Sequence, residues 1–359
     1  MNKAFDEVFD DVTRLGTKVK TDEYRDSGTH IIIDQGQGQI AGYTDLEKGL
    51  FTDVPAIVFG DHTRIIKYVE KPFFLGADGV KVFRSKDDNA NYKYLYYALK
   101  HVDIPNTGYN RHFKWLKESH IPYPSYTKQK QIVEVLDLVV DIMDKRRKEL
   151  SALDDLAKSQ FMEMFGDIPQ CEYVTMQDVC SLITDGTHQP PEFIDNGIPF
   201  LLVSNVTSNE LSYDTEKFIS EETYAQLMKR TPIEVGDVLL STVGSYGHPA
   251  IVKSDKRFSF QRHIAFLKPK RHILNSIFLH SAILSSDMQE QIEAKVNGVA
   301  QKTLNLSEIK TLRLPLPQIE RQKAFSAIVQ QLDKSKIAIR KSLDELQLLY
   351  DSLMQEYFG

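Results

Sequence analysis

Nearly all positions that recur at alternating spacings of four and three residues along two stretches of the chain are apolar, and the exceptions include Arg146 and Lys336. In the first stretch these positions are Ile132, Leu136, Val139, Met143, Arg146, Leu150, Leu153, Ala157, Gln160 and Met164. In the second they are Phe325, Val329, Leu332, Lys336, Ile339, Leu343, Leu346, Tyr350, Leu353 and Tyr357. A narrow apolar stripe kept over about five heptads is typical of a helix that packs against another helix. The pattern therefore predicts two long helices, each with a helical partner.

The two stretches are copies of one segment. Residues 121–166 align without a gap with residues 314–359, at a constant offset of 193 residues. The identities in this alignment include Pro122/Pro315, Pro124/Pro317, Gln129/Gln322, Lys130/Lys323, Arg147/Arg340, Lys148/Lys341, Leu150/Leu343, Leu153/Leu346, Leu156/Leu349, Glu163/Glu356, Phe165/Phe358 and Gly166/Gly359. A match of this length indicates a tandem duplication.

Each copy has a marked beginning and end. The two Pro-x-Pro motifs exclude helix just upstream, because a residue before proline is restricted to extended geometry. Gly166 and Gly359 are expected to end the helices in the left-handed cap conformation that glycine takes most readily. We expect the copies to pair with each other as a coiled coil within one chain, and pairing between subunits is the alternative. Each helix would be roughly 55 Å long.

The remaining segments, 1–120 and 167–313, are expected to be globular domains. Short apolar runs between polar, glycine-containing turns predict strands at His30–Asp34, Ala56–Phe59, Ile65–Val69, Val80–Phe83 and Ile198–Val203. Phe5–Val19 has an amphipathic pattern, and helices are expected at Tyr92–Leu99 and Ser276–Val296. The prediction is an α/β (α+β) fold with an internal pseudo-two-fold repeat. Its domains, 1–120 and 167–313, are separated by spacer helices at 121–166 and 314–359.

Composition favours a water-soluble protein of the cytoplasm. The chain has 359 residues and no apolar run close to the roughly 20 residues of a membrane span, and its start, Met1-Asn-Lys, does not resemble a secretory signal. The two cysteines, Cys171 and Cys180, are expected to be free thiols rather than a disulfide or zinc site. The net charge of −6 argues against nucleic-acid binding, although basic faces remain compatible with it.

No convincing catalytic or metal-binding motif is present in the sequence. Phosphate loops, nucleophile elbows, metalloprotease motifs and EF-hand loops are all missing. Asp61 with His62, or Asp185 with His188, could serve as an acid/base pair. We favour polar loops or ligand contacts at both places.

The polar loops of both domains share a set of side chains that suits DNA. They combine Gln, Asn, Arg, His, Tyr, Ser and Thr with glycine. Gln and Asn bind adenine edges, Arg binds guanine, and hydroxyl groups bind phosphate. The alternative is that these residues only cap turns. The recurrence of such loops in both domains favours DNA.

Several short motifs occur in an order that resembles the DNA-specificity subunit of type I restriction-modification systems. In the second half they are Asp185-Gly-Thr-His188, Gly197-Ile-Pro-Phe200, Ser204-Asn205, Gly236-Asp-Val-Leu-Leu-Ser241, Gly244, Gly247, Gln261-Arg262 and Leu314-Pro-Leu-Pro317 with Gln322. In the first half they are Gly60-Asp-His-Thr-Arg64, Tyr92–Leu99 and Ile121-Pro-Tyr-Pro124 with Gln129. The resemblance covers essentially the whole chain.

The resemblance implies two target-recognition domains held apart by an antiparallel coiled coil. Each domain would read one half of a bipartite double-stranded DNA target, and the helices would set the gap between the halves. Two modification subunits would supply S-adenosylmethionine and adenine methylation, and restriction subunits would add ATP- and Mg²⁺-dependent translocation and cleavage. The chain itself would hold no cofactor or metal and would not be an enzyme.

The loops that carry these motifs supply the candidate DNA-binding residues. For the first half-site they are Gln35, Gln37, His62, Arg64, Tyr109, Asn110 and Arg111. For the second they are Thr187, His188, Ser204, Asn205, Ser245, Tyr246, Gln261, Arg262, Gln301 and Lys302. Two alternatives remain: a non-catalytic coiled-coil scaffold for protein interactions, and an enzyme with a site in the Asp185–His188 loop.

Overall fold

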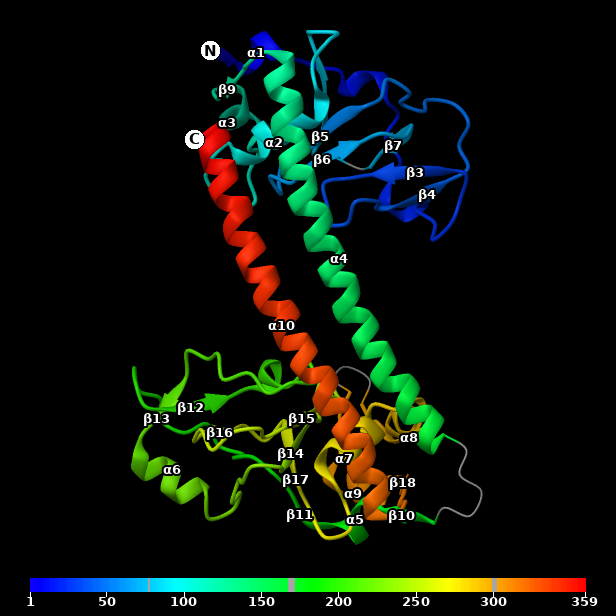
Figure 1. Cartoon of the computed structure of the whole chain (residues 1–359), viewed down its shortest axis with the longest axis vertical. Helices are drawn as coiled ribbons and strands as arrows, with labels where there is room; N and C mark the ends of the chain where they lie inside the picture. The colour runs from blue at the N-terminus through cyan, green and yellow to red at the C-terminus, as the bar shows by residue number, and fades with distance from the viewer. Residues whose placement is uncertain (77, 167–171, 299–301) are drawn as a thin grey trace. The chain divides into compact units, whose positions relative to one another are not determined.

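The chain forms two compact units that share the two long helices. A computed structural model describes residues 1–76, 78–166, 172–298 and 302–359. The first unit comprises Met1–Arg147 with Arg340–Gly359, and the second comprises Lys148–Ile339. Both long helices run through both units, so each unit contains one part of each helix (Figure 1).

The two predicted long helices are confirmed as α4 (Tyr126–Phe165) and α10 (Ile319–Phe358), of 40 residues each. Every residue of both apolar stripes is buried or half-buried, including the exceptions Arg146 and Lys336. The predicted left-handed glycine caps were wrong. Neither Gly166 nor Gly359 has a positive φ, and their N–H groups donate to Met162 O and Gln355 O as in a continuing helix.

In each unit the two helices pack antiparallel to one another. In the first unit Ile132 and Leu136, early in α4, share a core with Met354 and Phe358 at the end of α10. In the second unit Phe161 and Phe165, at the end of α4, lie against Phe325 near the start of α10, with ring centroids 5.6 Å apart in both pairs. Lys336 interrupts the stripe of α10 and forms an ion pair with Asp154 of α4 at 2.5 Å. The charged position is thus neutralised within the helix pair.

The first unit contains a four-stranded antiparallel sheet and a three-stranded sheet. The four-stranded sheet has the order β2 (Phe9–Asp11), β8 (Val80–Ser85), β5 (Ala56–Gly60), β6 (Ile66–Val69). The three-stranded sheet has the order β4 (Gly42–Thr44), β3 (His30–Ile33), β7 (Phe73–Leu75), with β3 and β7 parallel. A separate pair joins β1 (Asn2–Ala4) to β9 (His120–Pro122), just before α4. The short helices are α1 (Phe5–Val8), α2 (Tyr92–His101) and α3 (Phe113–Lys117).

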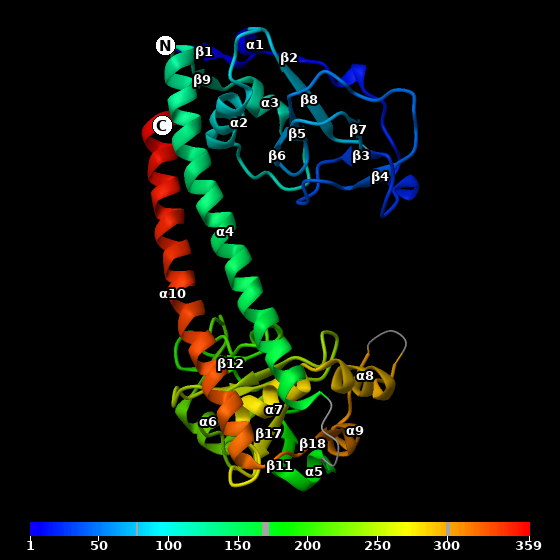
Figure 2. The same cartoon turned by 45° about the vertical axis from the view of Figure 1, so that its right-hand side comes forward.

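The second unit repeats this topology. Its four-stranded sheet has the order β11 (Cys180–Asp185), β17 (Ile264–Pro269), β14 (Val238–Ser241), β15 (Pro249–Ile251). Its three-stranded sheet has the order β13 (Phe218–Ile219), β12 (Ile198–Leu201), β16 (Ser259–Phe260), and β12 and β16 are again parallel. Before α10, β10 (Tyr173–Thr175) pairs with β18 (Arg313–Pro315). The helices are α5 (Met176–Val179), α6 (Glu221–Leu227), α7 (Ser276–Ile283), α8 (Ser286–Lys295) and α9 (Leu306–Thr311) (Figure 2).

Two predicted segments differ from the structure. Phe5–Val19 is a four-residue helix, the strand β2 and a 3-10 turn at Thr13–Leu15 rather than one amphipathic element. Ser276–Val296 is two helices: α7 ends at Ile283, and Ser285 starts α8 as its N-cap by accepting a hydrogen bond from Met288 N. The strands β4 and β7 were not predicted, since three-residue strands show too little alternation to be recognised.

A buried glutamine connects each long helix to the domain that precedes it. In the second unit Gln322 Oε1 accepts from Asn275 N (2.8 Å), and its Nε2 donates to Pro317 O (2.8 Å) and Ile273 O (2.9 Å). In the first unit Gln129 makes the matching bonds to Asn91 N (3.2 Å) and Pro124 O (3.1 Å). Asn91 and Asn275 are the N-caps of α2 and α7. The duplication has therefore preserved the junction between domain and helix.

Replacing Gln322 by alanine should lower the free energy of unfolding of the second unit by about 2–3 kcal/mol. The change leaves one buried N–H and two carbonyl groups without this partner. The measurement is urea unfolding with hydrogen exchange of the α7 amides as the local readout. Gln330→Ala, at an exposed position of the same helix, is the matched control and should cost less than about 0.5 kcal/mol. Equal effects of the two substitutions would contradict the junction role.

Candidate nucleic-acid interface

In the second unit, polar loops meet at one end of the four-stranded sheet. Asp185 of β11 pairs with Ala265 of β17, and Ser241 of β14 pairs with Ile264. The loops that follow β11 and β14 and the loop that precedes β17 therefore lie side by side. Leu201 of β12 pairs with Phe260 of β16, so these two parallel strands also end there. We call this the recognition end of the second unit.

Backbone hydrogen bonds join these loops to one another. Thr187 N donates to Phe260 O (3.2 Å), and Arg262 N donates to Thr187 O (3.0 Å). Leu304 N donates to Thr242 O (2.8 Å), and Gly244 N donates to Lys302 O (3.1 Å). The structure thus brings together loops that are far apart in the sequence. Thr187, Gln261, Arg262 and Lys302 are among the predicted residues that share this end.

Asp185 organises two side chains at the recognition end. Its carboxylate is 13% exposed, and Oδ2 accepts a hydrogen bond from His188 Nε2 (2.9 Å). Oδ1 accepts from Arg230 Nη2. An ionised carboxylate can only accept, so both partners present their remaining donors elsewhere. His188 and Arg230 are 56% and 52% exposed.

A second polar cluster connects the loop after β14 to α8. Lys302 Nζ donates to Glu293 Oε1 (2.6 Å) and to the Tyr246 hydroxyl (3.3 Å), and the hydroxyl donates to Glu293. Hydrogen bonds from Lys302 and Tyr246 lower the pKa of Glu293, and the bond to Glu293 raises the pKa of Lys302. The cluster fixes the direction of two predicted DNA-binding side chains.

The other predicted residues of the second unit differ in accessibility. Ser204 and Ser245 are exposed and Gln261 is half-buried. Asn205 is only 5% exposed, and its side chain accepts from Leu202 N (2.8 Å) and donates to Asp214 O (2.7 Å). It holds its own loop in this structure. Gln301 lies outside the described residues.

A cavity of about 220 Å³ opens at the recognition end. It is lined by Asp185, Thr242, Val243, Arg262, His263, Thr303, Leu304, Asn305 and Leu306. Arg262 Nε donates to His263 Nε2 (3.2 Å), and burial together with the Arg262 charge lowers the pKa of His263. A neutral His263 therefore acts as an acceptor that orients Arg262.

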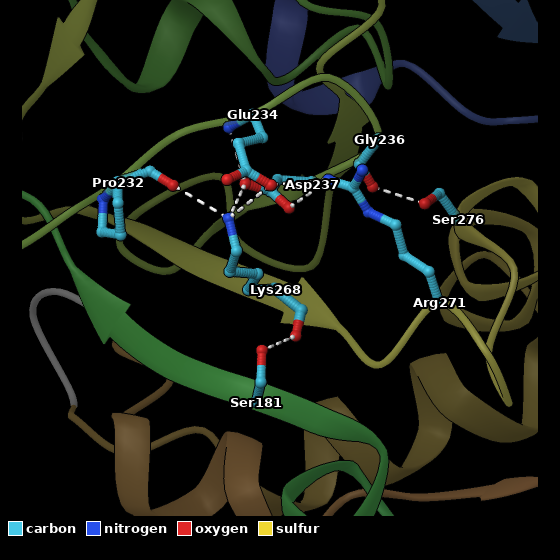
Figure 3. Close-up of polar contacts among 8 residues, drawn as sticks. All are labelled: Ser181, Pro232, Glu234, Gly236, Asp237, Lys268, Arg271 and Ser276. Atoms are coloured by element: carbon cyan, nitrogen blue, oxygen red, sulfur yellow. Dashed lines mark hydrogen bonds and ion pairs between the residues drawn. The ribbon is translucent and has the colours of Figure 1, made fainter.

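At the opposite end of the same sheet lies a buried carboxylate. Asp237 Oδ2 accepts from Glu234 N (2.8 Å) and Lys268 Nζ (3.3 Å), and Oδ1 accepts from Arg271 Nη2 (3.3 Å) (Figure 3). Its side chain is 0% exposed. Val238 follows it and pairs with Leu267, three residues along both strands from the recognition end. This cluster belongs to the framework of the domain.

In the first unit, four loops meet at the equivalent end of the sheets. Gln35 follows β3, and its Oε1 accepts from His62 N (3.2 Å) in the loop after β5. Gln35 Nε2 donates to Asp78 O (3.1 Å), just before β8. His62 Nδ1 lies 3.2 Å from Asn110 O, and its ring stacks on Tyr109 with centroids 4.6 Å apart. Four predicted residues are therefore in one cluster.

Buried Asp61 anchors the C-terminal end of the loop that carries Tyr109. Asp61 is 4% exposed, its carbonyl accepts from His112 N (2.8 Å), and its Oδ1 accepts from Phe113 N (2.7 Å). Asp61 is thus engaged with the backbone rather than with His62. Tyr109 is 85% exposed, and Asn110 and Arg111 are also exposed.

Gln37 and Arg64 are placed differently from the cluster. Gln37 is exposed in the loop after β3. Arg64 has a left-handed backbone, with φ of 64°, and its guanidinium donates to Ile104 O (3.0 Å). It therefore holds the loop before α3 in this structure. The DNA contacts of all these residues stay predictions.

Two charged residues at these ends were missed in the sequence. Arg230 follows α6 and lies 45 residues from its partner Asp185. Lys67 of β6 is 3% exposed and donates to Gly38 O (2.6 Å) and Asp34 Oδ1 (3.5 Å), which holds the loop after β3. Burial lowers the pKa of Lys67, and Asp34 offsets part of that shift. A lysine inside an apolar strand was a usable signal for Lys67, whereas Arg230 had none.

Residues 1–76, 78–166, 172–298 and 302–359 contain no group of three or more His, Cys, Asp or Glu side chains placed to hold a metal ion. Within the same ranges, no helix has the length and apolarity needed to cross a membrane. Cys180 is a buried free thiol, and burial raises its pKa to about 12; Cys171 lies outside the described residues.

The chain belongs to the family described as "Type I restriction modification DNA specificity domain". The model of that family matches residues 2–152 and 170–347, one match for each repeat. The family assignment made from the sequence motifs is thereby confirmed.

Individual relatives are distant. The chain is 24% identical over 307 residues to the type I restriction enzyme EcoBI specificity subunit of Escherichia coli, covering 75% of this chain and 65% of that protein. It is 24% identical over 347 residues to the EcoR124I/EcoR124II specificity subunit of Escherichia coli, covering 90% and 84%. It is 22% identical over 296 residues to the MjaVIII specificity subunit of Methanocaldococcus jannaschii, covering 73% and 68%. The chain thus spans somewhat under two thirds of the length of the EcoBI subunit.

Solved structures share the fold. The S subunit of a type I restriction-modification system from M. genitalium matches with a TM-score of 0.58 and 18% identity, over 100% of this chain and 96% of that one. A chain from a structural study of complex assembly and conformational transition of the type I R-M system matches with a TM-score of 0.55 and 17% identity, over 100% and 97%. The mixed fold with two long helices, predicted from the sequence, is therefore confirmed.

Proposed function

We propose that this chain is the sequence-recognition subunit of a type I restriction-modification complex. Each unit would read one half of a bipartite double-stranded DNA target. The observation that carries the proposal is the repeat of one topology in two units, each with a cluster of polar loops at the same end of its sheets. Family membership supports it independently.

The chemistry of the two clusters suits the reading of base edges. Arginine binds guanine with two donors, and glutamine or asparagine binds adenine with a donor and an acceptor. Arg262 is oriented by His263. Exposed Tyr109 and Arg111 project from a loop that buried Asp61 fastens. Rigid support of this kind is what a specific site requires, because it reduces the side-chain entropy lost on binding.

The long helices would set the spacing of the half-sites. Each has 40 residues, which corresponds to about 60 Å of helix. Two recognition domains, 1–120 and 167–313, joined by spacers of this kind would reach major grooves a helical turn or more apart. The gap in the target would then follow from the length of the helix pair.

The chemical steps would belong to partner subunits. Two modification subunits would bind this chain and supply S-adenosylmethionine and adenine methyl transfer. Restriction subunits would supply ATP- and Mg²⁺-dependent translocation and cleavage. The chain would itself be non-catalytic, would hold no cofactor, and would act in the cytoplasm where the DNA is.

Methylation mapping of genomic DNA tests the proposal. Cells that carry the neighbouring modification subunit are compared with and without this chain. Adenine methylation at a split motif should be present with the chain and disappear without it. If methylation is unchanged while the purified complex still binds its partners, the chain is a coiled-coil scaffold for protein interactions. In that case any DNA binding should lack the steep salt dependence of phosphate contacts.

A further inference from the structure

Arg230 lies at the recognition end of the second unit, and hydrogen bonds hold both its backbone and its side chain. Its backbone follows α6 in a tight turn, where Arg230 N and Thr231 N both donate to Leu227 O (3.1 and 3.2 Å). Thr231 is 4% exposed, and its hydroxyl also donates to Leu227 O (3.2 Å). The chain at this point is therefore anchored immediately beside an arginine that is half exposed.

The side chain of Arg230 is held as firmly as its backbone. Nη2 donates to Oδ1 of Asp185, whose carboxylate is 13% exposed. Asp185 is the last residue of β11 and is paired with Ala265 in the sheet, so it cannot shift without disturbing the strand. The same carboxylate holds His188 through its second oxygen. It also lines the cavity beside Arg262, which places Arg230 at the recognition end.

We propose that Arg230 reads a base of the second half-site, with Asp185 as its positioning residue; this inference rests on the proposed function. A guanidinium has five N–H donors in a planar fork, and Asp185 engages one edge only. The opposite edge then has a fixed direction, which suits the two acceptors of guanine in the major groove. A phosphate contact would need no such support, because phosphate accepts donors from many directions. The support argues for a base.

Arg257 provides a matched control in the same unit. It is 54% exposed, close to the 52% of Arg230, and it forms two hydrogen bonds with Glu221 (2.7 and 2.8 Å). It precedes β16, whereas the recognition loop with Gln261 and Arg262 follows that strand. Arg257 therefore has the same charge and nearly the same exposure, and it is also paired with a carboxylate, but it lies away from the recognition end.

The test uses the chain assembled with its modification subunits and duplexes that carry the split motif found by methylation mapping. Every base pair of both half-sites is changed in turn, and methylation rates are measured. Arg230→Ala should reduce discrimination at one base pair of the second half-site by roughly 5- to 100-fold. Discrimination in the first half-site should stay unchanged. Arg257→Ala should match the unaltered chain at all positions.

Asp185→Asn tests the positioning role. It should reduce discrimination at the same base pair as Arg230→Ala, and the double substitution should be no worse there than Arg230→Ala alone, because one acts through the other. Arg230→Lys retains the charge without the fork and should also lose discrimination. Thermal unfolding of each complex shows whether Arg230→Ala is folded, and Arg230→Lys replaces it in the test if it is not.

Two results would overturn the inference. Unchanged discrimination with Arg230→Ala and Arg230→Lys would remove Arg230 from the site. Uniform weakening for all sequences, with a shallower salt dependence, would make it a phosphate contact instead. Failure of the proposed function is separate, since then the unaltered complex would show no split motif at all.

Discussion

Asp237→Ala is expected to lower the free energy of unfolding of the second unit by about 2–4 kcal/mol. The carboxylate is fully buried and accepts hydrogen bonds from Lys268, Arg271 and the backbone N–H of Glu234. Alanine leaves all three without that acceptor. This loss of free energy is smaller than for a lysine left buried without a partner. Lys268 is 21% exposed, and its Nζ retains the ion pair with Glu234 (3.1 Å) and the hydrogen bond to Pro232 O (3.0 Å).

The effect should be confined to the second unit. Hydrogen exchange of the β14 and β17 amides gives the local free energy of opening, and fluorescence of Trp115, the single tryptophan, reports the first unit. Asp237→Asn should cost less, since its side-chain oxygen can still accept from Glu234 N. Glu221→Gln, which removes the exposed pair with Arg257, should cost under about 1 kcal/mol. If Asp237→Ala cost no more than Glu221→Gln, the cluster would not stabilise the domain.

The second large effect concerns the length of the helix pair. Seven residues inserted after Arg147 and seven after Arg340 should lengthen the gap of the methylated motif by about three base pairs, because seven helical residues add about 10 Å. Arg147 and Arg340 are equivalent in the repeat, and each is the residue of its helix at which the first unit borders the second along the chain. A whole heptad keeps both apolar stripes in register.

Methylation mapping measures this outcome directly. The two half-sites should remain as they were, because the recognition loops are untouched. A heptad inserted into α4 alone is the control, and it should abolish methylation at every gap, since the stripes of the two helices would no longer face each other. Altered half-sites with an unaltered gap would show that the helices are not the spacer.

Much of the architecture could be predicted from local sequence patterns. The alternation of four and three residues defined both long helices, since helical periodicity is a property of consecutive residues. A narrow apolar stripe such as the one through Leu136 and Val139 requires a helical partner. Because the helix is duplicated, the second copy could be predicted as the partner of the first. Short apolar runs identified β3, β5 and β12 for the same local reason.

Only part of the candidate site could be predicted from the sequence. Gln35, His62 and Tyr109 were selected for their chemistry, and the structure brings them together through contacts over tens of residues. The same reasoning also selected Asn205 and Arg64, which the structure shows bonded to their own loops. Side-chain chemistry is the same in a capping residue and in an exposed one. Only burial and partners distinguish the two.

The sequence alone determined the repeat, the two long helices and the family, because each depends only on the order and spacing of residues along the chain. The tertiary structure decided which loops share one end of a sheet, that Asp185 supports Arg230 across 45 residues of chain, and that Asp237 is the buried centre of a charge cluster. These facts depend on strand pairing and on the removal of side chains from water. Both arise only when distant segments of the chain pack together.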